Sequence, residues 1–243
     1  MQSVRIRTLP VGRTQPPLYK KKQLRVACDY FRSSDQIEKS IDSLVNNMQA
    51  AAKIGAEGVI FHGGSHKGKG FDNVFDQAVD TLQKVLELSP DNVWLCLENS
   101  AGMGAHIGSS FQEMGALIDG VNHPNLKVCL DTEHMFAAGY NITSPREIKV
   151  IMKEFDAEIG LDKLVAVHAN DSKVELGAGV DRHENIGDGH IGTDGFKCIM
   201  AEPSFKNVPF FLEVPGFDGE GPDKKNLDLL KEIRKTLECK SRH

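Results

Sequence analysis

The stretch that decides the fold runs from Val165 to Gly192 and reads VAVHANDSKVELGAGVDRHENIGDGHIG. A short apolar run ends on His168, and a polar, glycine-rich segment follows it. That segment contains Asp181 and His183, which an extended chain places on one side because side chains alternate with a period of two. Neutral imidazoles and ionised carboxylates both bind divalent metals near pH 7. The stretch therefore predicts a strand followed by a loop with metal ligands, with a solvated turn as the alternative interpretation of the loop taken alone.

The remainder of the chain repeats this succession of a strand and a helix. Short apolar runs predict strands at residues 58–61, 93–97, 126–130, 164–167 and 208–212, with a weaker one at 24–28. Apolar residues at helical spacing predict helices at residues 33–55, 71–88, 111–121, 145–159, 196–200 and 222–237. Such alternation is typical of parallel strands joined by right-handed crossovers. We therefore predict an α/β fold, specifically a TIM-type parallel (β/α) barrel.

A histidine or a carboxylate follows each of the five strong strands. These residues are His62, Glu98, Asp131, His168 and Glu213. One acid at such a place is usually a helix cap or a turn residue, but capping alone does not explain five in succession. In a parallel barrel the carboxyl ends of the strands meet on one face, and that face holds the site. Together with His134, Asp181 and His183 they make eight potential metal ligands.

Eight nitrogen and oxygen ligands are too many for one tetrahedral ion, so they predict a cluster of two or three metals. Mixed ligation of this kind suits Zn²⁺, with Mn²⁺ or Fe²⁺ as alternatives. A metal cluster can hydrolyse a phosphodiester by activating water and stabilising the attacking and leaving oxygens. One or two metals on the same barrel can instead polarise a sugar, which leaves a metal-dependent sugar isomerase as a competing interpretation.

Six motifs then resemble, in order and spacing, those of the endonuclease IV family of abasic-site endonucleases (AP endonuclease family 2). They are FHGGSH at 61–66, LENSAG at 97–102, CLDTEH at 129–134 with AAGY at 137–140, HANDSK at 168–173, VDRHENIG at 180–187 and LEVPG at 212–216. The resemblance extends from about Ser34 to the C-terminus.

The resemblance implies a TIM barrel with three zinc ions that cuts double-stranded DNA 5′ to an abasic site, as in base excision repair. His62 matches a ligand of the first zinc, and Glu98, the residue central to catalysis, matches the carboxylate that bridges two zincs. The second zinc would be held by Asp131, His168 and Glu213, and the third by His134, Asp181 and His183. The resemblance also suggests DNA contacts for Arg182, Lys173 and Tyr30, and a monomeric protein.

The N-terminal portion departs from the family pattern. Only residues 1–33 precede the first matching helix, and the sequence has no histidine before His62. We therefore expect a barrel of five or six strands that is incomplete at its N-terminus, with a weakened first zinc site. Open sheet edges would allow self-association and lower the stability of the monomer. An inactive or truncated remnant that binds metal or DNA is the alternative function. A second departure is Glu133, which stands where many members of the family have cysteine.

Composition sets the remaining expectations. The chain has 243 residues and a formal net charge of −5, yet residues 1–25 contain seven Lys or Arg and no acid. We interpret 1–25 as a basic, disordered segment and 26–243 as one catalytic domain. The chain has five cysteines, and Cys96 and Cys129 fall in apolar runs, which favours buried thiols in a reducing compartment. No run approaches the roughly 18 apolar residues of a membrane span. These features predict an intracellular protein of the cytoplasm, or of the nucleus or mitochondrion in a eukaryote.

Overall fold

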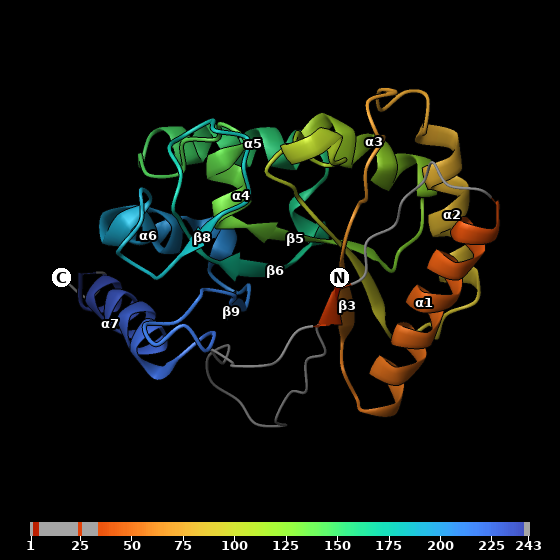
Figure 1. Cartoon of the computed structure of the whole chain (residues 1–243). Helices are drawn as coiled ribbons and strands as arrows, with labels where there is room; N and C mark the ends of the chain where they lie inside the picture. The colour runs from red at the N-terminus through yellow and green to blue at the C-terminus, as the bar shows by residue number, and fades with distance from the viewer. Residues whose placement is uncertain (1, 5–23, 26–33, 241–243) are drawn as a thin grey trace.

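The computed structural model describes residues 2–4, 24–25 and 34–240 (Figure 1). The main strands are β3 (Gly58–His62), β4 (Trp94–Glu98), β5 (Leu126–Asp131), β6 (Leu164–Ala169) and β9 (Phe210–Leu212). The long helices are α1 (Ser34–Lys53), α2 (Phe75–Glu87), α3 (Phe111–Val121), α5 (Glu147–Glu158), α6 (Gly192–Ala201) and α7 (Lys224–Lys240). Shorter elements are β1 (Gln2–Val4), β2 (Leu24–Arg25), α4 (Thr132–Ala137), β7 (Asp171–Ser172) and β8 (His183–Glu184).

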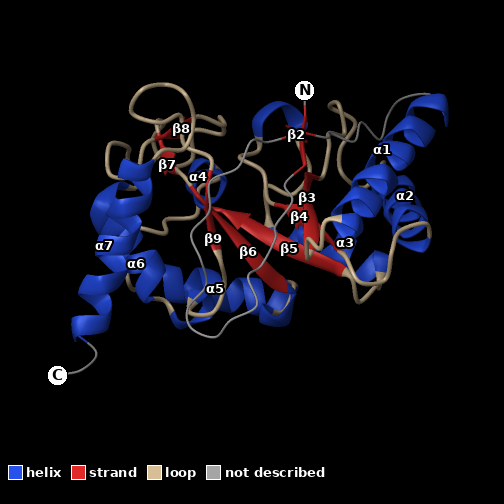
Figure 2. Cartoon of the chain, turned by 90° about the horizontal axis from the view of Figure 1, so that it is seen from below, coloured by secondary structure: helices blue, strands red, loops and turns tan. Residues whose placement is uncertain are grey.

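The five main strands form one parallel sheet in the order β3-β4-β5-β6-β9. The helices lie along the outside of this curved sheet, as the view from below shows (Figure 2). The prediction of a TIM-type parallel barrel that is incomplete is therefore confirmed within the described residues, where the sheet begins at β3 and ends at β9. Strand β1 pairs antiparallel with β2 and lies beside β3 without joining its sheet.

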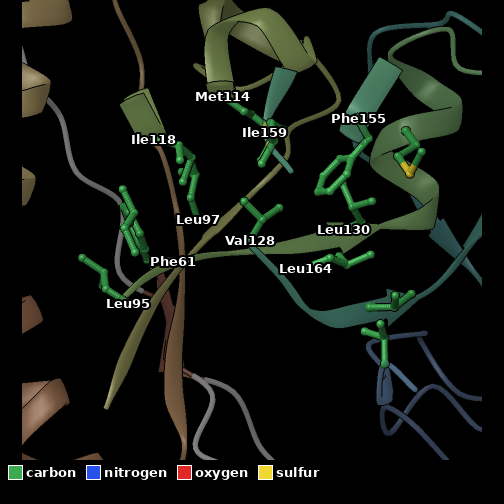
Figure 3. Packing of buried hydrophobic residues seen from close by; sticks show 14 of the residues in the cluster. Phe61, Leu95, Leu97, Met114, Ile118, Val128, Leu130, Phe155, Ile159 and Leu164 are labelled. Atoms are coloured by element: carbon green, nitrogen blue, oxygen red, sulfur yellow. The ribbon is translucent and has the colours of Figure 1, made fainter. Parts of the chain in front are cut away.

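The side chains of the sheet divide between its two faces because their direction alternates along each strand. Those of one set, including Phe61, Leu97 and Val128, pack outward against Met114 and Ile118 of α3 (Figure 3). Leu130 and Leu164 continue this core towards Phe155 of α5 (Figure 3). The outward face thus carries most of the hydrophobic burial that stabilises the fold.

The other set faces the inside of the curved sheet. It consists of Ile60, Cys96, Cys129 and Ala166, with Trp94, Val165 and Phe211 packed against them. Five of these positions stand two residues before a predicted metal ligand: Ile60, Cys96, Cys129, Ala166 and Phe211 precede His62, Glu98, Asp131, His168 and Glu213. Because the period of a strand is two, those ligands belong to the same inner face. The strand pattern itself therefore directs them into one place.

Several boundaries differ from the sequence-based ones. Helix α2 begins at Phe75 rather than at residue 71, and α6 is longer than predicted, extending from Gly192 to Ala201. The helix α4 and the hairpin β7–β8 were not expected from the sequence. Both are too short to show a hydrophobic period, because six residues make fewer than two helical turns and two residues cannot alternate.

The predictions for the N-terminal portion fall mostly outside the described residues. Of the segment 1–25, the structure describes Gln2–Val4 and Leu24–Arg25, which form β1 and β2, and the disorder expected for this segment stays a prediction. The division at residue 25 stays a prediction. Cys96 and Cys129 are buried free thiols, as predicted, and Cys198 is half-buried. No described helix has the length and apolar character needed to cross a bilayer.

Candidate metal centre

The five strand-end residues lie at the carboxyl edge of the sheet, with small differences from the predicted positions. His62, Glu98 and Asp131 are the last residues of β3, β4 and β5, His168 is the penultimate residue of β6, and Glu213 directly follows β9. The parallel register sets His62 beside Glu98 and Asp131 beside His168. Neighbouring ligands are therefore about one strand spacing apart, roughly 5 Å between backbones.

Glu98 lies at the centre of this edge, and only 2% of its side chain is exposed. Its Oε1 is hydrogen-bonded to Nδ1 of His168 and lies 3.9 Å from Nδ1 of His134. Its Oε2 lies 3.7 Å from Nε2 of His62. The two carboxylate oxygens thus face different histidines, which is the arrangement that a carboxylate bridging two cations requires.

Asp131 connects the sheet to the next element of the site. Its Oδ1 accepts the backbone N–H groups of Glu133 at 2.8 Å and His134 at 3.1 Å, so it caps α4. Its Oδ2 accepts Nδ2 of Asn170 at 2.5 Å and lies 3.8 Å from His168 Nδ1 and from His183 Nε2. One oxygen therefore holds the helix and the other faces the cluster.

Two asparagines without a predicted role, Asn99 and Asn170, hold Asp131 in place. Asn170 also accepts the backbone N–H of Glu213 at 2.8 Å, so a single side chain positions two candidate ligands. Asn99 accepts the backbone N–H of Asp131 at 2.6 Å and donates to its carbonyl at 3.2 Å. Such outer contacts orient metal ligands.

His134, Asp181 and His183 form the outer part of the cluster. Nδ1 of His134 donates to the carbonyl of Asn99 at 2.8 Å, and Nδ1 of His183 lies 3.4 Å from the carbonyl of Glu213. Each Nε2 therefore faces inward: that of His134 is 3.4 Å from Asp181 Oδ2, and that of His183 is 3.3 Å from Asp181 Oδ1. A histidine with one nitrogen on a carbonyl and the other towards carboxylates has the orientation of a metal ligand.

The inner edge is completed by His168 and Glu213. Nδ1 of His168 lies 3.2 Å from Oε2 of Glu213, whose side chain is 5% exposed. The potential ligand atoms of Glu98, Asp131, His168 and Glu213 all lie within 4.8 Å of one another. All eight residues predicted from the sequence are therefore brought together, and each lies within 4 Å of another member of the set.

The cluster includes two further side chains. Cys129 lies within the same 4.8 Å limit of Glu98 and His168, and Glu133 within that limit of Asp131, His134 and His183. From the sequence, Cys129 is predicted to be a buried thiol, and Glu133 is a departure from the family pattern. The signal was present for Cys129, since it precedes Asp131 by two residues on the inner face of β5.

The charged groups of the cluster shift the pKa values of its side chains. Burial raises the pKa of a carboxylic acid, but His168, His62 and His134 outweigh burial at Glu98 and hold its pKa well below the usual range. Burial opposes protonation of His134, yet Asp131 and the other carboxylates raise its pKa well above the usual value.

His183 and Glu133 shift in the direction that burial dictates. Burial lowers the pKa of His183, which favours its neutral, ligating form. Burial, assisted by Asp131, raises the pKa of Glu133 to about 7. A site that concentrates carboxylates in this way attracts positive charge, whether a proton on His134 or a divalent cation.

The hairpin β7–β8 supplies the rim of the cluster. Its two strands pair Asp171 with Glu184 and Ser172 with His183. Arg182 and Lys173 lie opposite each other on the hairpin, linked by a 2.9 Å hydrogen bond from the Lys173 N–H to the Arg182 carbonyl, and both side chains are exposed. Tyr30 lies outside the described residues.

Comparison with known proteins assigns this arrangement to a family. Residues 22–234 match the model of the xylose isomerase-like TIM barrel family. A probable endonuclease 4 of Haloarcula marismortui is 38% identical over 200 residues, which cover 82% of this chain and 71% of that protein. The chain belongs to the endonuclease IV family. A probable endonuclease 4 of Staphylococcus saprophyticus is 40% identical over 190 residues, which cover 78% of this chain and 62% of that protein.

Solved structures agree with the endonuclease IV assignment. The crystal structure of endonuclease IV from Thermus thermophilus superimposes with a TM-score of 0.73 at 29% identity, covering 87% of this chain and 73% of that one. A D-tagatose 3-epimerase-like protein has a TM-score of 0.69 at 18% identity, which is a likeness of fold alone. The chain therefore shares its barrel with a protein named for sugar chemistry and its sequence with the endonuclease IV family.

Proposed function

We propose that this protein is a zinc-dependent abasic-site endonuclease, which hydrolyses the DNA phosphodiester 5′ to an abasic site in base excision repair. The observation that carries the proposal is the convergence of eight predicted ligands, from six separate motifs, on one cluster at the carboxyl edge of the sheet. Membership of the endonuclease IV family supports the same chemistry. The alternative of an inactive remnant that binds metal or DNA is an outcome of the test below.

The chemistry of the donors fits a metal cluster. Nε2 of His183 and Oε2 of Glu133 are buried and have no hydrogen-bond partner in the described part of the chain, a costly state that a bound cation would relieve. Divalent ions held here would polarise the scissile phosphate and lower the pKa of a water molecule. Imidazole and carboxylate donors suit Zn²⁺, with Mn²⁺ or Fe²⁺ as alternatives.

The family resemblance implies how the ligands divide among three ions, and the distances are compatible with that division. His62 and Glu98 would hold a first ion, and Glu98 would be shared with a second that also binds Asp131, His168 and Glu213. His134, Asp181 and His183 would hold the third, and both histidines lie 3.3–3.4 Å from Asp181. The first position has the fewest ligands of the three, and 26% of the His62 side chain is exposed, so we expect the weakest binding there.

The rim of the site suits a polyanionic substrate. Arg182 and Lys173 are exposed on the hairpin that also carries His183 and the neighbouring Asp181, so phosphates bound to them would lie beside the cluster. Contacts of this kind position a duplex without reading its sequence. We therefore propose double-stranded DNA as the partner and assign Arg182 and Lys173 to backbone contacts.

Incision of a labelled duplex with a single abasic site tests the proposal. The zinc-loaded protein should cut 5′ to the site, leaving a 3′-hydroxyl and a 5′-deoxyribose phosphate, and metal analysis of the same sample should find Zn²⁺. The substitution Glu98→Gln removes one charged oxygen at the centre of the cluster and should lower activity by at least about 100-fold, since the loss of mere outer-shell partners costs 10- to 100-fold.

The matched control is Glu113→Gln, the same chemical change at a carboxylate of α3 that accepts the Gly108 N–H at 2.9 Å outside the cluster. It should incise like the wild type. If metal-loaded wild type leaves the duplex uncut but binds it, the remnant alternative is correct. Turnover of a free sugar without incision would instead favour an isomerase.

A further inference from the structure

Glu133 is the one acid of the cluster for which the family pattern provides no role. It lies in the first turn of α4, is fully buried, and has ligand atoms of Asp131, His134 and His183 within 4.8 Å. The motif CLDTEH places it between two candidate ligands, at the position where the resemblance led us to expect cysteine.

One oxygen of Glu133 has a structural explanation. Oε1 accepts the backbone N–H of Arg182 at 3.1 Å and the hydroxyl of Ser172 at 3.4 Å. These bonds attach the hairpin β7–β8 to α4. A neutral side chain of the same shape could accept both of them, so anchoring the hairpin does not require a carboxylate.

The other oxygen has no such explanation. Oε2 is buried without a hydrogen-bond partner among the described residues. Leaving a charged oxygen in this state costs several times the free energy of an ordinary hydrogen bond. The inward-facing Nε2 of His183 is likewise buried and lacks a hydrogen bond in the same part of the structure. Glu133 and His183 belong to one group of potential ligands within 4.8 Å of one another, and each has a buried ligand atom without a hydrogen bond. A cation site has these features when its ligands are arranged around the ion.

We propose that Glu133 is a direct ligand of a divalent cation that it shares with His134 and His183. The inference rests on the metal centre of the proposed function and adds to it a carboxylate ligand at a position where many members of the family have cysteine. The ion would then be bound by oxygen and nitrogen donors from α4 and from β8, which ties the hairpin to the helix through the metal as well as through Oε1. Zn²⁺ and Mn²⁺ both accept this ligand set.

The variant Glu133→Gln separates the two roles of the side chain. It retains an acceptor for Arg182 and Ser172 but removes the ligating charge. Metal-free protein prepared by chelator dialysis would be titrated with Zn²⁺ against a competing chromogenic chelator. We expect one class of site to weaken by about 10- to 100-fold or more while the others are unchanged. Glu113→Gln is the matched control and should bind like the wild type.

Each result has one meaning. Wild-type affinity and stoichiometry in folded Glu133→Gln would overturn the role of Glu133 and leave the proposed function intact. A wild-type protein that binds no metal would overturn both.

If the Glu133→Gln variant does not fold, a measurement on the wild-type protein tests the same proposal. In crystals of the zinc-loaded wild type, the anomalous signal should place an ion about 2.0–2.2 Å from a Glu133 oxygen. An ion bound to His134 and His183 with Glu133 beyond that distance would refute the proposal.

Discussion

Substituting Asp171 with asparagine should destabilise the segment that closes the site. Asp171 is fully buried in β7. Its Oδ1 accepts the backbone N–H groups of Ser172 at 2.8 Å, Ile191 at 2.9 Å and Gly192 at 3.2 Å. Its Oδ2 accepts those of Gly187 at 2.8 Å and Gly192 at 3.1 Å. A single carboxylate thus anchors residues 187–192 behind the hairpin that carries His183.

The magnitude follows from these bonds. An asparagine has one oxygen and one NH₂ group. It loses fewer hydrogen bonds when the NH₂ group replaces Oδ2, where it faces the N–H of Gly187 and removes one of the two acceptors of the Gly192 N–H. A hydrogen bond to a charged group contributes about 1.5–3 kcal/mol, and a buried N–H left unpaired costs about 1–3 kcal/mol. We therefore expect Asp171→Asn to lower the free energy of unfolding by about 2–5 kcal/mol, a large part of the roughly 5–15 kcal/mol of an ordinary domain.

Urea unfolding in the presence of EDTA, monitored by circular dichroism, measures this effect without a contribution from metal binding. The matched control is Asp194→Asn, the same change at an exposed carboxylate paired with Lys197, and it should leave the midpoint unchanged. An Asp171→Asn midpoint equal to that of the control would refute the anchoring role. In that case the segment 187–192 would have to be held by its own packing.

Three other predictions concern packing, pH and salt. A Cβ added at Gly115 would lie 2.2 Å from the carbonyl oxygen of Glu158, so Gly115→Ala should push α3 from α5 and cost about 1–3 kcal/mol or more in thermal unfolding; an unchanged melting temperature would contradict this. The raised pKa of Glu133, about 7 against 4.5, means that its contribution to the stability of metal-free protein is present below pH 4.5 and lost as the pH rises through 7. The unfolding free energy of wild type relative to Glu133→Gln should fall over that range, and a flat difference would disprove it. Duplex binding should weaken steeply with salt, and Arg182→Ala should reduce that slope by about 1; an equal slope would remove Arg182 from the interface.

The alternation of apolar and polar residues was sufficient to locate most of the site. His62, Glu98 and Asp131 end short apolar runs, and parallel strands bring their carboxyl ends together. Periodicity was less informative where elements are short. The helix α4 has six residues, too few to show a hydrophobic period. Its start is fixed by two backbone N–H groups that donate to Asp131, and only the structure shows these hydrogen bonds.

Contacts between residues distant in the chain could not be predicted. Asn170 is hydrogen-bonded to both Asp131 and Glu213, which are 39 and 43 positions away from it in the chain. Neither spacing belongs to a sequence pattern that would predict these contacts. Glu133 looked like an isolated substitution within a motif. Its importance depends on the hairpin β7–β8 folding over α4, which pairs one oxygen with Arg182 and leaves the other buried without a hydrogen bond among the described residues.

The sequence by itself determined the parallel α/β architecture and the identity of the five clustered side chains at the strand ends. It could do so because both depend on local rules: a period of two along each strand, and one common direction for all the strands. Only the tertiary structure decided which carboxylate oxygen faces which histidine and which acids have further partners. Those relations depend on how crossovers and loops pack, and the distances that result, such as 3.3 Å between His183 and Asp181 or 3.7 Å between His62 and Glu98, follow from no local pattern.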